Sequence, residues 1–592
     1  MRTGYLNASK WLALAALLTA TAATHAVPLP ASAHSAGAGS ESTPHTRFIV
    51  QAASAQAARQ SVERAGGEVQ QDLDIIRAVA ARLTPAQQAR LRTVSGVRLY
   101  EDRSVGTQAT LAATLVSNAS TSTVLTDGSG LAAPAFMYQT DYPGLVGADT
   151  LQKAGITGKG ITVAVLDTGL WQDFAQQYQG RVLASIDVLN GGKGPVTGDP
   201  YGHGTHITSI AAGGAMNIAG GYLAIAPQTN LVIVRAFDGT GAGRYADVIA
   251  GLNFIVTNKT KFKIRVLNLS FGAAPQSDYW DDPLNQAVMA AWKAGIVVVA
   301  AAGNQGPKPM TIGVPGNVPY IITAGALTDN NTPYDGTDDR LASFSSTGPT
   351  YEGFVKPELV APGGHMVGSQ QSTSYLANID PGSMTGYETL FTMSGTSQAA
   401  AVTTGVVALM LQADPTLTPD TVKCRLMASA RPAITSAGTL AYSVFQQGAG
   451  LINAVAAVNS AALGCANKGL NIAYDLAGTA HYGGPANRDA SGNYYIMNLG
   501  ASVWGTPLVG DGYTWSQGYT WSQGYTWSQG YTWSQGYTWS QGYTWSQGYT
   551  WSQGYTWSQG YTWSQSIPWW GTKGATIPAT KSASIVNWVP NQ

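Results

Sequence analysis

The chain of 592 residues has little charge and no long apolar run in its interior. Charged residues make up 11% of the sequence, and 32 basic side chains balance 32 acidic ones. Binding to nucleic acid or to an anionic membrane depends on an excess of basic residues, so we expect neither partner. No run beyond the N-terminal region reaches the roughly 18 apolar residues that a membrane-spanning helix needs.

The first 33 residues follow the three-part plan of a secretory signal peptide. A basic start precedes an apolar stretch from Trp11 to Ala23, and small-residue cleavage sites follow at Ala26 and Ala33. The apolar stretch is too short to span a bilayer. We therefore expect a secreted, soluble, extracellular protein, with attachment to a surface through its C-terminal region as a further option.

Cysteine is scarce as well, since Cys424 and Cys465 are the only two. In an oxidising compartment we expect a single disulfide between them, which would stabilise the fold by roughly 4 kcal/mol in the chain-entropy model. Two buried free thiols are the alternative.

Residues 46–104 alternate strand-like and helix-like segments in the order strand, helix, strand, strand, helix, strand. This order is typical of a small α+β domain of the ferredoxin-like kind. Residues 105–143 are rich in Ala, Ser, Thr and Gly and have no clear periodicity. We interpret them as an exposed linker that contains a processing site.

A larger domain is expected over residues 144–465. Nearly continuous β-branched runs alternate there with helical segments, which predicts an open parallel α/β sheet with helices on both faces. Ligands of such sheets bind beyond the carboxyl ends of the strands. Asp167, Ser270 and Asn304 each stand at the end of an apolar run.

Ser397 lies in Gly-Thr-Ser397, just before a strongly apolar segment. A serine held by small residues at the start of a buried helix suits a hydroxyl nucleophile, because the helix N-terminus presents free N–H groups to an oxyanion. Serine is also a common N-cap residue, so this motif alone does not establish a nucleophile. His203 stands between two glycines ahead of another small-residue segment, whereas His365 and His481 are interpreted as structural.

Asp167-Thr-Gly, His203-Gly-Thr-His and Gly-Thr-Ser397 together resemble the three signatures of subtilisin-like serine peptidases, in that family's order. The resemblance implies that Ser397 attacks the scissile carbonyl, that His203 transfers the proton and that Asp167 orients the imidazole. Asn304, in Ala-Ala-Gly-Asn304, matches the family's side-chain oxyanion donor. Residues 46–104 resemble the inhibitory propeptide, which implies a self-processing zymogen.

The resemblance also implies three substrate-binding segments. They are Ser270, Phe271 and Gly272 on one edge, Gly241, Ala242 and Gly243 on the other, and Ala301, Ala302 and Gly303 as a pocket wall. A substrate peptide would pair with the two edges as an additional strand. A pocket lined by Ala, Gly and Phe predicts a preference for a sizeable apolar or aromatic side chain before the scissile bond.

Two positions depart from the family's pattern. Ala401 stands where a proline is usual, which should affect the start of the helix more than the chemistry. Ile218 stands where many subtilisins have a calcium-ligating Asn, so we assign no metal ligand. We expect a monomer that needs no cofactor, with structural calcium elsewhere as an unassigned alternative.

The C-terminal region changes composition. Residues 466–511 are a glycine-rich, β-like extension, residues 512–565 are nine copies of Gly-Tyr-Thr-Trp-Ser-Gln, and residues 566–592 form a tail. In an extended chain the period of six places every Tyr and Trp on one face, which would suit stacking on polysaccharide or on itself. The alternatives are a spacer, or a surface or matrix-binding protein in which these repeats are the functional part.

Overall fold

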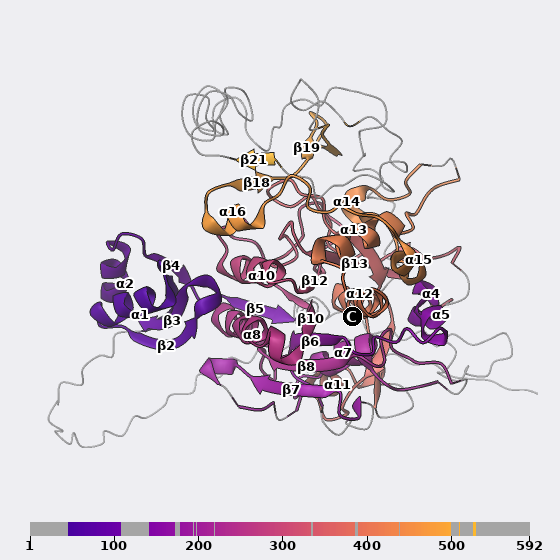
Figure 1. Cartoon of the computed structure of the whole chain (residues 1–592), viewed down its shortest axis with the longest axis horizontal. Helices are drawn as coiled ribbons and strands as arrows, with labels where there is room; N and C mark the ends of the chain where they lie inside the picture. Colours follow the sequence, from indigo (N-terminus) through magenta and orange to yellow (C-terminus); the bar gives the residue numbers. More distant parts are fainter. Residues whose placement is uncertain are drawn as a thin grey trace, which may run out of the picture. The chain divides into compact units, whose positions relative to one another are not determined.

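The computed structural model describes residues 45–107, 141–171, 178–192, 194–196, 198–217, 220–332, 336–384, 389–436, 439–498 and 508, and the backbone of 525–527 (Figure 1). The predicted signal peptide, the tail and most of the predicted linker and repeats lie outside these residues. The described residues belong to one unit, His45–Gln592. Among them, no helix has both the length and the apolar character to cross a membrane.

The N-terminal module is a four-stranded antiparallel sheet with two helices. Its sheet has the order β2-β3-β1-β4, and its own core lies between the sheet and the helices. Ser54 caps the first helix, and Thr84 forms a capping box with Gln87 at the second. The elements are β1 (Thr46–Gln51), α1 (Ala55–Arg64), β2 (Glu68–Leu73), η1 (Asp74–Ile76), β3 (Ala78–Leu83), α2 (Pro85–Arg92) and β4 (Arg98–Glu101).

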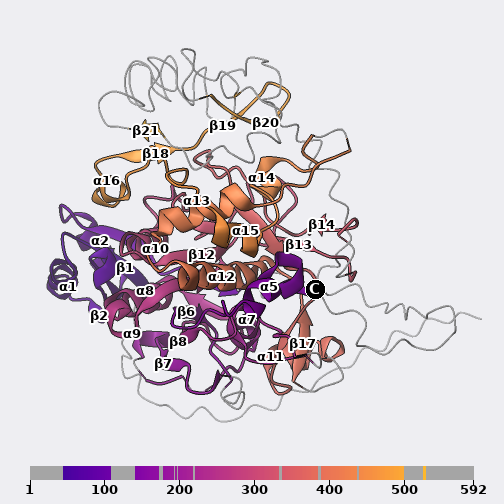
Figure 2. The ribbon, with the colours of Figure 1, turned by 45° about the vertical axis from the view of Figure 1, so that its right-hand side comes forward.

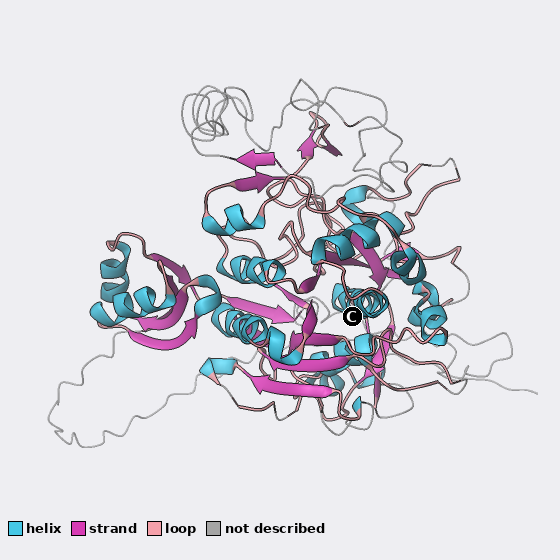
Figure 3. Ribbon diagram, viewed as in Figure 1, coloured by secondary structure: helices cyan, strands magenta, loops and turns pink. Residues whose placement is uncertain are grey.

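The large domain is organised around an eight-stranded sheet, drawn in magenta in Figure 3. Its path is β14-β13-β12-β10-β6-β8-β7, with β15 also paired to β13, and every pairing except β13 with β14 is parallel. The strands are β6 (Thr162–Asp167), β7 (Val182–Asp187), β8 (Asn230–Arg235), β10 (Ile264–Leu269), β12 (Val297–Ala301), β13 (Ile322–Thr328), β14 (Arg340–Leu341) and β15 (Leu359–Pro362). This confirms the predicted open α/β architecture.

Helices surround this sheet because its central strands are buried on both faces, as the continuous apolar runs predict. The buried helix α12 (Thr396–Ala413) packs against β10, β12, β13 and β15, and its position beside the sheet can be followed in Figure 2. The main helices besides α12 are α7 (His203–Ala212), α8 (Tyr245–Thr257), α10 (Pro283–Lys293) and α13 (Pro419–Ser429). Shorter elements are α4 (Tyr142–Val146), α5 (Ala148–Lys153), η4 (Leu189–Gly191), α9 (Lys259–Phe262), β16 (Met366–Ser369), α11 (Tyr375–Ile379), η5 (Pro381–Ser383), β17 (Leu390–Met393), α14 (Val444–Gln447) and α15 (Ala454–Asn459).

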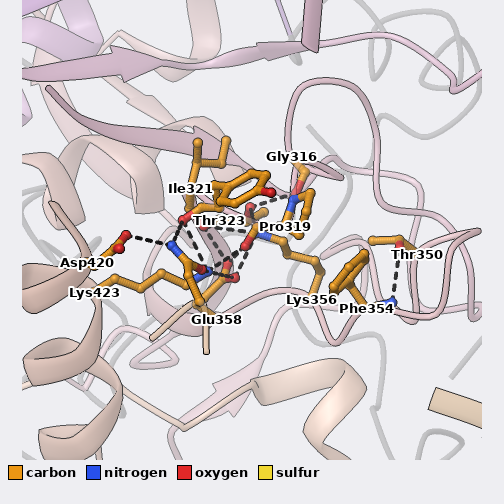
Figure 4. Close-up of polar contacts among 12 residues, drawn as sticks. Gly316, Pro319, Ile321, Thr323, Thr350, Phe354, Lys356, Glu358, Asp420 and Lys423 are labelled. Carbon is orange, nitrogen blue, oxygen red and sulfur yellow. Dashed lines mark hydrogen bonds and ion pairs between the residues drawn. The ribbon is translucent and has the colours of Figure 1, made fainter. Parts of the chain in front are cut away.

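A cluster of buried charges lies where β13 and β15 begin (Figure 4). Glu358 Oε1 is 2.7 Å from Lys356 Nζ and 2.9 Å from Lys423 Nζ, and both lysine side chains are fully buried. Lys423 also donates hydrogen bonds to the carbonyl of Pro319 and to Asn467 Oδ1. Glu358 Oε2 accepts from Thr323 N at 2.8 Å, so this one carboxylate joins the segments around residues 323, 358 and 423.

Cys424 of α13 forms a disulfide with Cys465. The predicted extension that follows packs against the large domain through residues 466–498. Asp475 accepts hydrogen bonds from the hydroxyls of Tyr279 and Tyr320, and His481 stacks on Trp280 with ring centroids 4.7 Å apart. A boundary at residue 465 therefore does not coincide with the end of the packed fold.

The described part of the extension contains one short helix and three short strands. These are α16 (Ile472–Ala477), β18 (His481–Gly483), β19 (Ala486–Arg488) and β20 (Tyr494–Ile496). In the repeats, β21 (Tyr525–Trp527) pairs antiparallel with β18. The other repeat residues lie outside the described part of the chain, so their role in surface binding or as a spacer stays a prediction.

Candidate active site

Asp167 and His203 form a buried pair. Asp167 is the last residue of β6, and His203 is the first residue of α7. His203 Nδ1 lies 2.8 Å from Asp167 Oδ1, and Thr168 N donates to the same oxygen. Because a carboxylate accepts the proton of Nδ1, this contact favours the tautomer in which Nε2 is free to take a proton. Nε2 makes no hydrogen bond to the described residues.

Asp199 fixes the turn that precedes His203. Asp199 was not identified in the sequence analysis. Its Oδ1 accepts from Gly202 N, and its Oδ2 accepts from both the backbone N and the hydroxyl of Thr205, all at 2.8 Å. A capping carboxylate four residues before the histidine was the available signal. Position 204 requires glycine, because a Cβ there would lie 2.4 Å from the carbonyl oxygen of Gly169.

Ser397 is the second residue of α12, at the N-terminus of a helix in which 16 of 18 residues are buried. Its hydroxyl donates to the carbonyl of Ser270 at 3.1 Å, and the Ser270 hydroxyl donates to the carbonyl of Ser397 at 3.0 Å. The Ser270 hydroxyl also accepts from Asn268 Nδ2. These bonds hold the serine against the carboxyl end of β10, on the same edge of the sheet as Asp167.

Asn304 lies next to the start of α12. Its Oδ1 accepts from the backbone N of Thr396 at 3.0 Å and from the Thr396 hydroxyl at 2.9 Å. Since the amide oxygen is engaged, the Nδ2 hydrogens are directed away from Thr396, and a Cβ placed on Gly395 would lie 3.2 Å from Nδ2. The amide donor and the α12 N-terminus thus offer positive potential beside Ser397.

His206 of the second signature has a supporting role in this arrangement. Burial lowers the pKa of His206 to about 4, so the ring is neutral at physiological pH. Its Nε2 lies 3.0 Å from the carbonyl of Phe391, which fixes the proton on Nε2 and leaves Nδ1 to accept from Gln398 Nε2. His206 therefore ties the helix of His203 to the residue that follows Ser397.

The two predicted substrate edges have a third strand between them. The strand β5 (Ser104–Thr107) pairs antiparallel with β9 (Ala242–Arg244) and with β11 (Phe271–Gly272). Thr107 N also donates to the carbonyl of Gly241 at 3.0 Å. The predicted linker thus begins too early, because residues 105–107 are ordered by strand pairing despite their linker-like composition, and α4 begins at Tyr142 within its other end.

The predicted pocket wall lies beside these strands. Ala301 ends β12, and Ala302 and Gly303 follow it, all three being buried. Gly303 N donates to the Thr396 hydroxyl, and a Cβ on Gly303 would meet the Ser346 hydroxyl oxygen at 2.7 Å. The structure therefore brings all nine predicted substrate-binding residues to the edge that carries Asp167, His203, Ser397 and Asn304.

Comparison with known proteins identifies the family of this chain. The model of the subtilase family matches residues 158–450. Serine protease AprX of Bacillus subtilis (strain 168) is 41% identical over 273 residues, which are 45% of this chain and 60% of AprX. Subtilisin DY of Bacillus licheniformis is 31% identical over 315 residues, which are 53% of this chain and 96% of that protein.

Among solved structures, fervidolysin from Fervidobacterium pennivorans, a keratinolytic enzyme related to subtilisin, has the same fold. Its TM-score is 0.56 at 19% identity, and the match covers 83% of this chain and 68% of that chain. The match to AprX spans less than two thirds of that relative's length. Subtilisin DY, in contrast, is matched over nearly its whole length, and the chain therefore belongs to the subtilase family of serine peptidases.

Proposed function

We propose that this chain is a secreted serine endopeptidase that is made as a self-processing zymogen. In this proposal Ser397 attacks the scissile carbonyl, and His203 takes the hydroxyl proton and returns it to the leaving amine. Asp167 stabilises the imidazolium, and Asn304 donates to the oxyanion of the tetrahedral intermediate. The chemistry uses protein groups alone and requires no cofactor.

The observation that carries this proposal is the position of β5. A strand of the chain's own N-terminal region lies between β9 and β11, with its carboxyl end directed toward the residues around Ser397. This is how a substrate would bind by strand addition, with backbone hydrogen bonds on both sides. The N-terminal module is thereby connected to the cleft by a substrate-like segment.

The register of β5 indicates where in the chain the first cleavage should occur. Phe271 pairs with Thr107 and Gly272 with Gly106. In an antiparallel pair, the next position on one strand is the previous one on the other, so Ser270 corresponds to the position after Thr107. Because the Ser270 carbonyl holds the Ser397 hydroxyl, we place the processing cut within the first residues after Thr107.

The same module has the contacts expected of an intramolecular inhibitor. Arg47 of β1 lies 2.8 Å from Asp102 and 3.3 Å from Asp247 of α8, and Gln51 donates to Gln286 of α10 at 2.8 Å. These groups are mostly buried, and contacts among buried charged groups depend strongly on both partners being present. They support retention of the module after its link to the enzyme is cut.

Replacement of the nucleophile tests the proposal. We expect the Ser397→Ala chain, expressed in a host lacking other secreted proteases, to keep its N-terminal module covalently attached and to leave casein intact. The unaltered chain should hydrolyse casein, lose this activity with a serine-directed covalent inhibitor, and have a mature N-terminus just after Thr107. Normal maturation of Ser397→Ala would refute self-processing, and casein hydrolysis by that variant would refute the catalytic assignment.

A further inference from the structure

The side chain of Arg103 is bound by two residues of the large domain, Asp282 and Tyr245. Its Nη2 donates to Asp282 Oδ2 at 2.5 Å and to the Tyr245 hydroxyl at 3.1 Å, and its guanidinium carbon lies 4.5 Å from the centre of the Tyr245 ring. The Tyr245 hydroxyl also donates to Asp282 Oδ2 at 3.2 Å. Tyr245 and Asp282 are both fully buried. An aromatic face and a carboxylate thus enclose one planar cation.

The site continues the substrate cleft. Tyr245 follows β9 directly and begins α8, and its backbone N donates to the carbonyl of Arg103 at 3.0 Å. The backbone ladder that pairs β5 with β9 therefore extends to Arg103. Any peptide that binds in the register of β5 would bring its residue four positions before Thr107 over the Tyr245 ring.

We propose that Tyr245 and Asp282 form a substrate subsite for an arginine side chain, at the position that Arg103 takes relative to Thr107. This inference rests on the proposed peptidase function. It adds a specificity determinant far from the scissile bond, whereas the pocket beside Ser397 has Ala and Gly walls that carry no charge.

Without Arg103, the buried Asp282 carboxylate should favour binding of another cation. Its Oδ1 is engaged by the backbone N of Leu284 and Asn285 at the start of α10, so Oδ2 is the oxygen that faces the ligand. Burial raises the pKa of Asp282, and Arg103 is the strongest influence in the opposite direction. A bound guanidinium would again offset the cost of the buried charge.

Arginine suits this site better than lysine. The guanidinium is planar, so it can lie against the Tyr245 ring while Nη2 donates to both the Tyr245 hydroxyl and Asp282 Oδ2. An ammonium is more strongly hydrated and offers a point charge without this geometry. We expect the order arginine, lysine, citrulline in peptides that differ at this position alone.

The experiment uses the processed enzyme, separated from its N-terminal module, and internally quenched peptides with the sequence of residues 101–112 of this chain. One peptide keeps arginine at the position of Arg103, one has citrulline there, and a third has glutamine there with arginine moved to the position of Ser104. We expect kcat/KM to be about tenfold higher for the first peptide than for either of the others, mainly through KM, since a cation–π contact and a charged hydrogen bond are lost together.

Three enzyme variants test which side chains cause this difference. Asp282→Asn keeps an oxygen that can cap α10 but loses the charge, so the ratio of kcat/KM between the arginine and citrulline peptides should fall to near one. Asp281→Asn makes the same change one residue earlier, at a carboxylate that contacts Arg98 and Tyr100 instead, and should keep the ratio. Tyr245→Phe keeps the ring and should reduce the ratio only in part.

The outcomes separate the subsite from the peptidase function. Failure to cut any of the three peptides would count against the proposed function itself. Equal kcat/KM for the three peptides in the unaltered enzyme, or an unchanged ratio in Asp282→Asn, would overturn the subsite while leaving the peptidase function intact. If Asp282→Asn does not fold, two results together would overturn the subsite. They are an undiminished ratio of kcat/KM between the arginine and citrulline peptides in Tyr245→Phe, and an equal kcat/KM for the peptides with arginine at the positions of Arg103 and Ser104.

Discussion

Glu358→Gln should strongly destabilise the protein, because its single carboxylate forms ion pairs with two buried lysines. Glu358 Oε1 contacts both Lys356 and Lys423, and Oε2 lies 2.9 Å from Lys356 Nζ and accepts from Thr323 N at 2.8 Å. Glutamine has nearly the same shape and keeps one acceptor oxygen. The substitution therefore removes charge while changing the packing very little.

The magnitude follows from the geometry. Both ammonium groups touch the same oxygen, so they are at most ~6 Å apart and repel each other by about 3 kcal/mol at an effective dielectric constant of about 20. Removing one partner of a buried ion pair typically costs about 3–5 kcal/mol. We expect the free energy of unfolding to fall by about 3–5 kcal/mol. The two estimates are not added, because both describe the same uncompensated charge.

The loss should also depend on pH. Burial lowers the pKa of Lys356 to about 7, and Glu358 is the main influence opposing that shift. Without Glu358 the pKa of Lys356 falls further. The folded variant then binds this proton less readily than the unfolded chain does, so its stability rises with pH toward the ordinary lysine pKa. The difference from the unaltered protein should be largest below pH 7 and smaller at pH 9.

Urea unfolding of the full chain at pH 6 and pH 9 measures this, with Ser397→Ala as the common background to prevent self-digestion. Glu63→Gln is the matched control, because the Glu63 side chain is 56% exposed and its pair with Arg59 should contribute less than about 0.5 kcal/mol. A loss of under about 1 kcal/mol for Glu358→Gln at pH 6, or a larger loss at pH 9 than at pH 6, would refute the reasoning.

Two further substitutions test separate parts of the structure. Asn304→Ala should lower kcat by roughly 100- to 1,000-fold with little change in KM, as steady-state kinetics on a peptide would measure, and a rise in KM alone would contradict the oxyanion role. For Glu352, burial, aided by Asp278, raises the pKa to about 8, so the stability from its bound proton is present at low pH and is lost as pH rises through about 8. Glu352→Gln should therefore raise the melting temperature relative to the unaltered chain at pH 9 more than at pH 5, and an equal effect at both would contradict this assignment.

The sheet could be predicted because burial on both faces leaves a direct mark on the sequence. Strands such as Thr162–Asp167 are continuous apolar runs, and polar residues at their ends identify the functional edge. The residues of the candidate site could be predicted because they lie in local sequence motifs. Asp167, His203 and Ser397 each belong to a short motif whose residues all serve one local geometry.

Residues that act through tertiary contacts left no comparable mark. Lys356 and Glu358 are charged residues next to a proline, which in sequence reads as a solvent-exposed turn, yet the fold buries both. Tyr279 and Tyr320 bind Asp475 across the supposed domain end, so the composition shift after Cys465 did not reveal where packing stops. Neither arrangement follows from a periodicity, because each joins segments that are distant in the chain.

The strand β5 shows most clearly why such a segment escapes sequence reasoning. Ser104–Thr107 consists of small residues, which resemble a linker, and its order comes from backbone hydrogen bonds to β9 and β11. A cleft that recognises backbone must accept many sequences, so the occupant needs no distinctive composition. Selectivity then has to come from side chains at the ends of the ladder. In this chain Arg103 over Tyr245 is such a contact, and it is set by tertiary structure rather than by any motif.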